Sequence, residues 1–264
     1  MTPFLKWAGG KRWLTQRYPE LFPDNYRHYI EPFVGSGAVF FSLQPHSGVL
    51  ADCNGALIET YVAIKNDWER VEAKLKEHHQ KHSKDYYYKV RASSPRTPYA
   101  RAARFIYLNR TCFNGLYRVN KQGWFNVPKG TKNNAVLDTD DFKGIADALS
   151  SFEITQSDFE AVIDAAAKGD FIFADPPYTV KHNANNFVKY NEELFHWNYQ
   201  ERLRDALLRA SKRGVLIMMT NAAHKCVKDL YADCFQIMEL ERKSVIASDS
   251  TNRGLYKEIV VRNW

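Results

Sequence analysis

The chain has 264 residues, 45% of them hydrophobic, and a formal net charge of +7. This length and composition suffice for a packed core, and the longest strongly apolar run, residues 215–219, is too short to cross a bilayer. The N-terminus has no apolar signal-peptide core and the four cysteines form no C-x-x-C pair, so we expect a cytoplasmic protein without disulfides or structural zinc.

The positive charge is concentrated in the middle of the chain. Residues 55–145 contain 17 lysines and arginines against 9 aspartates and glutamates, a net charge of +8, whereas the remaining residues hold 20 against 21. A concentrated positive segment favours a polyanionic partner, because neutralised phosphates release counterions. A solvated basic surface without a partner explains the same pattern equally well, and charge alone leaves both interpretations open.

Short apolar runs predict buried strands at residues 28–34, 48–52, 152–156, 170–174 and 214–220. Near-continuous apolar runs of this length are typical of a sheet that is covered on both faces. Between the later runs, Asp158 can cap a helix that extends to Ala167. Asn198 can open another helix, which ends at Gly214. This alternation predicts an α/β fold with crossover helices.

The middle segment differs in character. Residues 56–110 are typical of charged helices, with breaks near residues 93–95 and at Pro98. Residues 116–128 then predict a β-hairpin that turns at residues 121–123.

The chain contains no repeat and no Gly/Ser linker, so a second domain must be an insertion. We expect residues 1–55 and 146–264 to form the α/β domain. Residues 56–145 are expected to form an inserted, mainly helical domain that carries the hairpin.

Three stretches near the N-terminus form a candidate nucleoside site: "FLKWAGGK" (4–11), "EPFVGSG" (31–37) and "ADCN" (51–54). A glycine turn after a first strand lets a ligand approach the backbone, and an acid after the second strand, Asp52, can accept hydrogen bonds from ribose hydroxyls. Neither glycine turn has the spacing of a diphosphate-binding loop, and Lys11 is followed by arginine rather than serine or threonine. S-adenosylmethionine, a nucleoside without a diphosphate, satisfies this pattern, although each turn alone fits an ordinary loop.

The stretch "FIFADPPYT" (171–179) ends a predicted strand with an acid, two prolines and a tyrosine. Methylation of an exocyclic amine on a base is difficult because the lone pair of the nitrogen is delocalised into the ring, so the nitrogen must be made more tetrahedral. Asp175 and the carbonyl of Pro176 can each accept a hydrogen bond from such an amine and aim its lone pair at a methyl donor. Tyr178 can stack on the base. A strand that ends in a Pro-Pro turn explains these letters alone, whereas the nucleoside-type turns favour catalysis.

Taken together, these stretches resemble the D12 class, the DNA adenine methyltransferases of the Dam type. The similarity extends over nearly the whole chain and keeps the order "FLKWAGGK", "EPFVGSGAVFF", "LADCN", "LNRTCFNGLYRVNKQGWFNVP" and "FADPPY". The resemblance implies a Rossmann-like S-adenosylmethionine-dependent methyltransferase fold with an inserted target-recognition domain. It also implies double-stranded DNA as the partner, adenine methylated on N6 as the product, and a bacterial or phage origin.

The resemblance, together with the glycine turn, assigns roles to individual residues. The residues expected to bind S-adenosylmethionine are Trp7, Lys11, Glu31, Phe33, Gly35, Asp52, Asp158 and Asp175. The residues expected to bind a flipped-out adenine are Asp175, Pro176 and Tyr178. The residues expected to contact DNA are Lys6, Phe113, Asn114, Leu116, Arg118 and Pro128.

The resemblance also implies the DNA sequence that is read. Phe113 stands where related enzymes often carry a tyrosine. Its ring can still insert into the base stack as a wedge, but it lacks the hydroxyl of that tyrosine. Asn114 is expected to fill the space that the base leaves. The residues that match positions reading GATC are Lys6, Leu116, Arg118 and Pro128, and an arginine suits a bidentate contact with guanine. We therefore expect GATC as the site.

Two other functions stay open: methylation of RNA or of a protein amide, and sequence-specific DNA binding without catalysis. The basic insertion argues against a protein substrate, and aspartate rather than asparagine at position 175 favours adenine in DNA. An intact Asp175 argues against a silent binding protein.

Other features receive simpler interpretations. The histidines His78, His79 and His82 lie in a charged helix and are interpreted as a solvated face, so we expect no metal site there. Separately, we expect the protein to be a monomer and to need no metal. Residues 185–197 are a candidate cover for the flipped base. Lys243 and Arg253 are weak candidates for phosphate contacts.

Overall fold

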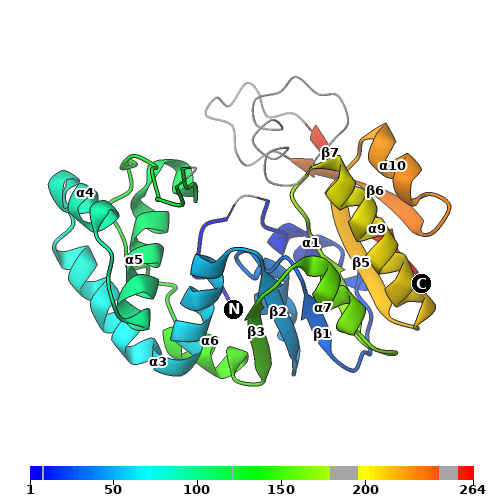
Figure 1. Ribbon diagram of the computed structural model, residues 1–264, viewed down its shortest axis with the longest axis horizontal. Helices are drawn as coiled ribbons and strands as arrows, with labels where there is room; N and C mark the ends of the chain where they lie inside the picture. The colour runs from blue at the N-terminus through cyan, green and yellow to red at the C-terminus, as the bar shows by residue number, and fades with distance from the viewer. Residues whose placement is uncertain (8, 121, 179–195, 244–254) are drawn as a thin grey trace. The chain divides into compact units, whose positions relative to one another are not determined.

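The computed structural model describes the whole chain except residues 8, 121, 179–195 and 244–254 (Figure 1). The chain divides into two compact units. Unit 1 comprises Met1–Leu21 and Val34–Gln156, and unit 2 comprises Phe22–Phe33 and Ser157–Trp264. The predicted insertion lies wholly within unit 1, and its boundaries stay a prediction.

Two of the sequence-based expectations fall outside this description. They concern most of the segment 185–197, expected to cover the base, and the side chains of Lys243 and Arg253, expected to contact phosphates. Among the described residues, no helix combines the length and the hydrophobicity that crossing a membrane requires. All four cysteines are free thiols.

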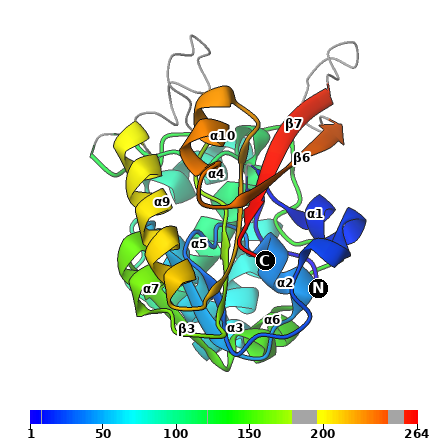
Figure 2. The same ribbon diagram turned by 90° about the vertical axis from the view of Figure 1, so that its right-hand side faces the viewer.

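Unit 2 contains five paired strands in the order β1, β4, β5, β7 and β6. Their bounds are β1 (Tyr29–Glu31), β4 (Phe171–Ala174), β5 (Leu216–Ala222), β6 (Gln236–Lys243) and β7 (Leu255–Arg262). β4 runs parallel to β1 and β5, whereas β7 runs antiparallel to β5 and β6. Three predicted strands are confirmed here with shifted ends. The antiparallel pair β6 and β7 was not predicted, and it is followed most easily in Figure 2.

Within the described part of unit 2, three helices accompany these strands: α7 (Phe159–Ala165), α9 (Trp197–Lys212) and α10 (Lys225–Tyr231). α7 packs beside α9 (Figure 1), and α10 contacts both α9 and β6. Asp158 caps α7 as predicted, because its Oδ1 accepts a hydrogen bond from the backbone N–H of Glu160 at 2.9 Å. The helix stops two residues before the predicted end.

α9 connects β4 to β5 and buries an apolar face. It begins at Trp197 with His196 in the cap position, so the predicted start at Asn198 is wrong by one residue. Gly214 adopts a left-handed φ of +83° just after the helix, as its predicted place at the end requires. The predicted apolar face is confirmed, since the following residues are fully buried: Leu203, Ala206, Leu207 and Ala210.

Unit 1 contains the parallel pair β2 (Gly48–Asp52) and β3 (Phe152–Gln156), whose bounds agree with the predicted strands. Its shorter helices are α1 (Arg12–Arg17), α2 (Ala38–Leu43) and α6 (Phe142–Leu149), with 3-10 turns η1 (Pro19–Leu21) and η2 (Phe113–Gly115). The alternation of parallel strands and helices in both units confirms the predicted α/β class.

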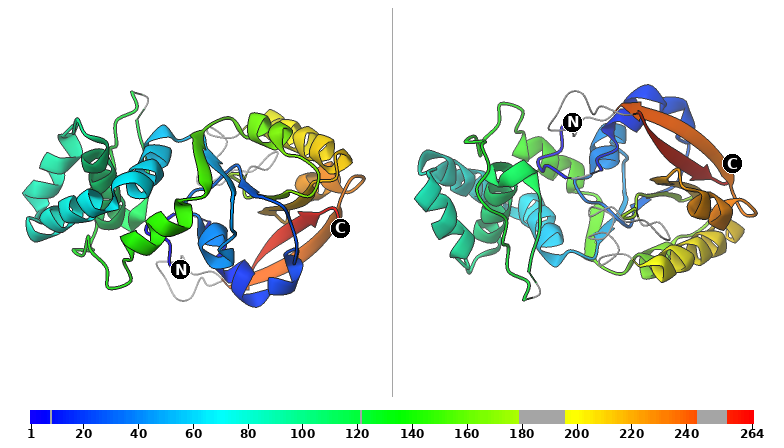
Figure 3. Two further views of the ribbon diagram at one scale, coloured as in Figure 1. Left: turned by 90° about the horizontal axis from the view of Figure 1, so that it is seen from below. Right: turned by 90° about the horizontal axis from the view of Figure 1, so that it is seen from above.

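The predicted charged helices are α3 (Gly55–Gln80), α4 (Lys84–Ala92) and α5 (Pro98–Thr111). The two views of Figure 3 show all three next to one another, and α5 packs against both α3 and α4. Pro98 does not break a helix but begins α5, because the first helical position needs no backbone N–H. The side chains of Asn54 and Ser83 cap α3 and α4.

The predicted hairpin is confirmed in a minimal form. Val119 and Phe125 make one antiparallel bridge, and the backbone N–H of Asn120 donates to the carbonyl of Trp124 at 2.9 Å. The Asn120 side-chain oxygen also accepts from the N–H of Trp124, which closes the turn. At Gly123, φ is +82°, a value that favours glycine.

Candidate active site

Asp175 directly follows β4 and is held by the neighbouring strand. β4 and β5 pair in parallel with Ala174 opposite Met219, which places Thr220 beside Asp175. The Thr220 hydroxyl donates to Asp175 Oδ1 at 2.6 Å. Thr220 is fully buried, so water does not compete for this hydrogen bond. The carboxylate therefore has a defined orientation at the end of the strand.

Tyr178 is bonded to a residue on the antiparallel strand β7. Its hydroxyl donates to Glu258 Oε2 at 2.9 Å, and Glu258 is only 6% exposed. Burial, followed by the negative charges of Asp175 and Glu258, raises the pKa of Tyr178 well above its ordinary value. The phenol therefore stays protonated and remains a donor.

The proline turn is fixed by α9. The side chain of Gln200 donates from Nε2 to the carbonyl of Pro177 at 3.3 Å. In turn, Asn221 Nδ2 donates to Gln200 Oε1 at 3.1 Å, and both amide side chains are fully buried. Three elements, β5, α9 and β7, thus each contact the Asp-Pro-Pro-Tyr segment, which itself follows a fourth, β4.

Three other predicted cofactor residues lie in unit 2. Glu31 ends β1, is 3% exposed and accepts a hydrogen bond from the hydroxyl of Tyr29 at 2.8 Å. Phe33 stacks on Phe159, the first residue of α7, with ring centroids 5.3 Å apart. Asp158 is exposed, and besides capping α7 its Oδ1 pairs with Arg202 at 2.9 Å. Asp158 therefore has a structural role whether or not a cofactor binds.

In unit 1 the structure brings Trp7, Gly35 and Asp52 together. Asp52 Oδ2 accepts from the backbone N–H of Gly35 at 3.2 Å, and its Oδ1 accepts from the N–H of Asn54 at 2.9 Å. Burial raises the pKa of Asp52, and these two backbone hydrogen bonds partly offset the effect. A Cβ at Gly35, where φ is +47°, would lie 2.9 Å from the Trp7 ring, so only glycine fits without a shift.

The remaining predicted residue of this group, Lys11, is buried, and its Nζ donates to the carbonyl of Gly9 at 2.7 Å. Trp7 also stacks on Tyr117 and Phe105, with ring centroids 5.8 and 6.5 Å apart. The Trp7 ring is therefore held between the Gly35 turn and aromatic side chains of α5 and the hairpin.

The six predicted DNA contacts all lie in unit 1, and Lys6, Phe113 and Pro128 make hydrogen bonds there. The backbone N–H of Lys6 donates to Asn109 Oδ1 at 2.8 Å, and Nζ of Lys6 donates to the carbonyl of Arg110 at 3.3 Å. Phe113 N–H donates to the carbonyl of Pro128 at 2.9 Å. Burial, then the charges of Lys132 and Arg110, lowers the pKa of Lys6.

The DNA-contact candidates of η2 and of the hairpin are exposed. Phe113 is 51% exposed and Leu116 is 38% exposed, which is unusual for large apolar side chains. Asn114 is exposed and adopts a left-handed φ of +55°. Across the hairpin, Arg118 Nε donates to Asn126 Oδ1 at 3.0 Å. These side chains are available to a partner.

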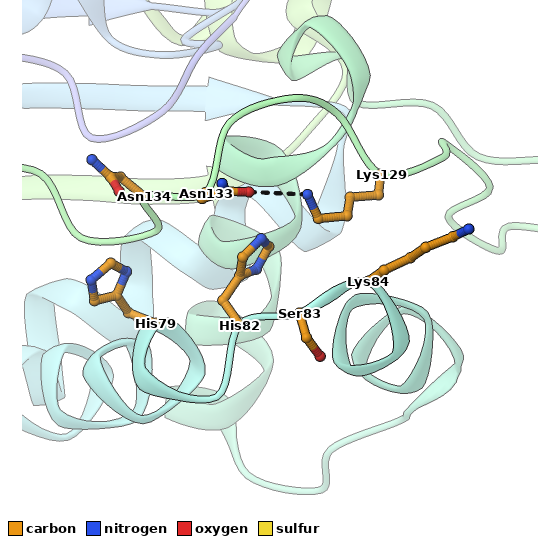
Figure 4. A pocket seen from close by; sticks show the side chains of 7 residues that line it. All are labelled: His79, His82, Ser83, Lys84, Lys129, Asn133 and Asn134. Carbon is orange, nitrogen blue, oxygen red and sulfur yellow. Dashed lines mark hydrogen bonds between the residues drawn. The ribbon is translucent and has the colours of Figure 1, made fainter.

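The histidine cluster does not form the predicted solvated face. His78 is 7% exposed and shares a hydrogen bond with Tyr86, while His82 shares one with Tyr107, because the end of α3 packs against the aromatic residues of α4 and α5. Beside them lies a cavity of about 450 Å³ (Figure 4), lined by His79, His82, Ser83, Lys84, Lys129, Asn133 and Asn134. Among the described residues, no group of three His, Cys, Asp or Glu side chains could hold a metal ion.

Sequence reasoning missed the residues that hold the Asp-Pro-Pro-Tyr segment: Thr220, Glu258, Gln200 and Asn221. They lie 21 to 80 residues away in the chain from the groups they bond. Thr220 and Asn221 end an apolar run, Glu258 follows Lys257, and Gln200 lies in an amphipathic helix, so no local pattern distinguishes them.

Comparison with known proteins agrees with this arrangement. Residues 7–246 match the family described as D12 class N6 adenine-specific DNA methyltransferase. The Type II methyltransferase M1.LlaDCHI of Lactococcus lactis is 37% identical over 273 residues, covering 100% of this chain and 96% of that protein. The Type II methyltransferase M.MjaIII of Methanocaldococcus jannaschii is 34% identical, covering 99% of each chain.

A third relative is the DNA adenine methylase of Haemophilus influenzae, 32% identical over 265 residues, which cover 98% of this chain and 92% of that protein. The family match, with the α/β arrangement of strands and helices, confirms the predicted Rossmann-like methyltransferase fold. The chain therefore belongs to the D12 class of N6 adenine-specific DNA methyltransferases, enzymes that methylate adenine in DNA on its exocyclic nitrogen.

Proposed function

We propose that the protein transfers a methyl group directly from S-adenosylmethionine to N6 of an adenine that is flipped out of duplex DNA, within the sequence GATC. The observation that carries this proposal is the Asp-Pro-Pro-Tyr segment after β4, whose acid, turn and ring are each held by a buried partner from another element. A segment fixed in this way is suited to hold one flat base with an amino group at its edge.

The chemistry needs a nitrogen whose lone pair points at the methyl donor. Asp175 and the carbonyl of Pro176 accept hydrogen bonds from the two N–H groups of the amine and orient it. Transfer would form the N–C bond as the S–C bond breaks with its electrons left on sulfur, and the Asp175 carboxylate, which accepts a hydrogen bond from the amine, would take up the proton that the nitrogen loses. The ring of Tyr178 holds the base by stacking. Bound S-adenosylmethionine supplies the electrophilic methyl group, and no metal or covalent protein intermediate is needed.

The residues fit the cofactor. At Gly35 a Cβ would collide with the Trp7 ring, so glycine lets this turn and the indole lie in contact, which supports a joint place for them in the cofactor site. Asp52, at the end of β2, is the acid suited to ribose hydroxyls. We assign Trp7, Lys11, Gly35 and Asp52 of unit 1 to this role. From unit 2, we assign Glu31, Phe33, Asp158 and Asp175.

The proposed DNA contacts are supported by the exposed side chains of the hairpin and of the neighbouring turn η2. We assign Lys6, Leu116, Arg118 and Pro128 to the recognition of GATC, with residues 56–145 as the target-recognition domain. We propose that Phe113 inserts into the base stack and that Asn114 fills the vacated space, which the exposure of both side chains on one turn supports. We also propose that the protein acts as a monomer in the cytoplasm.

The test uses purified protein, labelled S-adenosylmethionine and a duplex that contains one GATC site. We expect N6-methyladenine in that site, no transfer to a duplex without GATC, and none to RNA of the same sequence. Asp175→Ala should abolish transfer while S-adenosylmethionine still binds. The control is Asp164→Ala, which removes an exposed carboxylate of α7 paired with Arg209 and should leave transfer unchanged. Methylation outside GATC would withdraw the roles of Leu116 and Arg118.

A further inference from the structure

Two side chains of the Asp-Pro-Pro-Tyr segment, Asp175 and Tyr178, are hydrogen-bonded to buried polar residues on strands that are far away in sequence. We propose that Thr220 of β5 and Glu258 of β7 are positioning residues for methyl transfer: Thr220 sets the plane of the Asp175 carboxylate, and Glu258 sets the direction of the Tyr178 ring. This inference rests on the proposed function and adds two residues to it.

Thr220 constrains the terminal side-chain torsion of Asp175, which would otherwise rotate freely. The terminal torsion of an aspartate is broad, so its carboxylate plane rotates easily unless a partner fixes it. The Thr220 hydroxyl bonds one oxygen of Asp175 at 2.6 Å, which is short, as expected for a bond to a charged acceptor. A carboxylate has about four acceptor positions, so this bond orients the group without exhausting its capacity to accept from an amine.

Glu258 constrains an aromatic ring from its far end. Tyr178 has two side-chain torsions, and a bond of 2.9 Å at the hydroxyl fixes where the ring lies. The ring is the surface on which the base is proposed to stack, and stacking of a base on an aromatic side chain is worth about 1–3 kcal/mol. Loss of the bond from the hydroxyl therefore weakens the hold on the extruded base.

The identity of these residues argues against a purely structural role. Glu258 is followed on β7 by Ile259, Val260 and Val261, all buried. Burial of a carboxylate costs free energy, and an apolar residue at the same place often gives a more stable protein. A phenylalanine at position 178 would present the same aromatic face and would need no acceptor, but no hydrogen bond would fix the direction of its ring. The buried Tyr178–Glu258 pair thus costs free energy that apolar side chains of the same size would not, whereas its hydrogen bond fixes the direction of the Tyr178 ring.

The first experiment compares Thr220→Val, which removes the hydroxyl at nearly constant volume, with Thr220→Ser, which keeps it. We expect Thr220→Val to lower kcat by about 100-fold while KM for DNA changes by less than about twofold, because a misaligned amine slows the chemical step and not the encounter. Thr220→Ser should recover most of the rate. Thr60→Val, another buried threonine whose hydroxyl bonds a backbone carbonyl in α3, is the matched control and should keep kcat.

The second experiment is a double-mutant cycle on Glu258→Leu and Tyr178→Phe. Single-turnover methylation is measured, together with the fluorescence of a duplex that carries 2-aminopurine in place of the target adenine, which reports extrusion and stacking of the base. If Glu258 acts through the Tyr178 hydroxyl, the double variant is no slower than the slower single variant. Glu258→Gln, which keeps an acceptor, should retain the wild-type fluorescence signal. Tyr178→Phe alone carries the test if Glu258→Leu does not fold.

The outcomes separate the inference from the function on which it rests. Wild-type protein that forms no methyladenine overturns the proposed function. Active wild-type protein, with Thr220→Val and Tyr178→Phe both within about twofold of its rate, overturns only the positioning roles. Independent, multiplicative losses in the cycle overturn the role of Glu258 through Tyr178. A fall in rate for Thr60→Val equal to that for Thr220→Val would assign the effect to stability and overturn the role of Thr220.

Discussion

Gly35 illustrates how a single backbone position limits the cofactor site. Its φ of +47° lies in the left-handed region, and an added Cβ would lie 2.9 Å from Cδ1 of Trp7 and 3.0 Å from Nε1. Gly35→Ala must therefore either move the indole or strain the turn that Asp52 also bonds. We expect S-adenosylmethionine to bind about tenfold more weakly or worse, which corresponds to roughly 1.4 kcal/mol. Isothermal titration calorimetry with S-adenosylmethionine measures this change.

The control for this variant is Gly123→Ala in the hairpin turn. Gly123 also has a positive φ, +82°, but nothing lies within 4 Å of an added Cβ. It shares the backbone strain of Gly35→Ala without the collision, so its affinity for S-adenosylmethionine should equal that of the wild type. Equal weakening in both variants would show that the collision with Trp7 is irrelevant.

The limits of sequence reasoning are visible at this scale in the Asp-Pro-Pro-Tyr segment. Asp175 and Tyr178 were predicted because they stand in one four-residue motif, and the order of the residues in this motif has a chemical reason. Thr220 and Glu258 were not, because pairing of β4 with β5 and of β5 with β7 brings them near. Only the strand register reveals such partners, and the assigned roles of all four residues await the experiments above.

Among the elements, α5 is anchored by a buried ion pair. The Arg110 guanidinium is 0% exposed and bonds both oxygens of Asp140 at 2.6 Å, and it also donates to the carbonyls of Phe4 and Ala135. Arg110→Met leaves the Asp140 carboxylate without this partner in a buried site. We expect a loss of about 3–5 kcal/mol in the free energy of unfolding, measured by urea denaturation.

An exposed ion pair of α6 serves as the comparison. Lys143 and Asp147 are each 67% exposed, and Lys143→Met should change the free energy of unfolding by less than about 1 kcal/mol. A similarly small change for Arg110→Met would mean that neither the charge pair nor the hydrogen bonds of the same guanidinium to Phe4 and Ala135 stabilise these segments.

The packing of α3 against α4 and α5 predicts acid sensitivity. Burial, followed by the positive charge of Lys74, lowers the pKa of His78 to about 4 from an ordinary 6.5. The unfolded chain binds this proton first as the pH falls, so stability is full above about pH 6.5 and declines towards pH 4. We expect a loss of about 2 kcal/mol from this residue between pH 7.5 and pH 5.

Urea denaturation of the wild type and of His78→Gln at both pH values tests this expectation. Because glutamine does not titrate, the variant should lose less stability on acidification than the wild type does. Parallel losses in both proteins would place the acid sensitivity elsewhere, for example at His82, whose pKa is also lowered by burial.

Elements were predictable from sequence where one local pattern dominated. β2 and β3 were predicted with correct bounds because short apolar runs are bounded by polar residues on both sides. β6 was missed because the sequence of Gln236–Lys243 is largely polar, and its place beside β7 is set by pairing rather than by composition. His78 of α3 was wrongly predicted to be solvated. Helix packing, and not the charge of the surrounding sequence, decides which face of a helix is covered.

For the whole molecule, the uneven charge predicts how DNA binding responds to salt. The net charge of +8 in residues 55–145 exceeds the total of +7, so the basic segment supplies the entire excess. If it contacts about four phosphates, the logarithm of the association constant should fall with a slope of about −3 to −4 against the logarithm of salt concentration. Fluorescence anisotropy of a labelled duplex measures the slope. A slope near zero would favour a basic surface without a nucleic-acid partner.

The exposed apolar side chains have a consequence for the protein in solution. Of the large apolar residues that are exposed in the described chain, all but Met238 lie within residues 113–124, namely Phe113, Leu116, Val119 and Trp124. A concentrated protein without nucleic acid is left with this water-facing apolar surface, which promotes self-association. Nucleic acid would then act as a solubilising partner, so complete removal of DNA during purification should lower the concentration at which the protein stays dispersed.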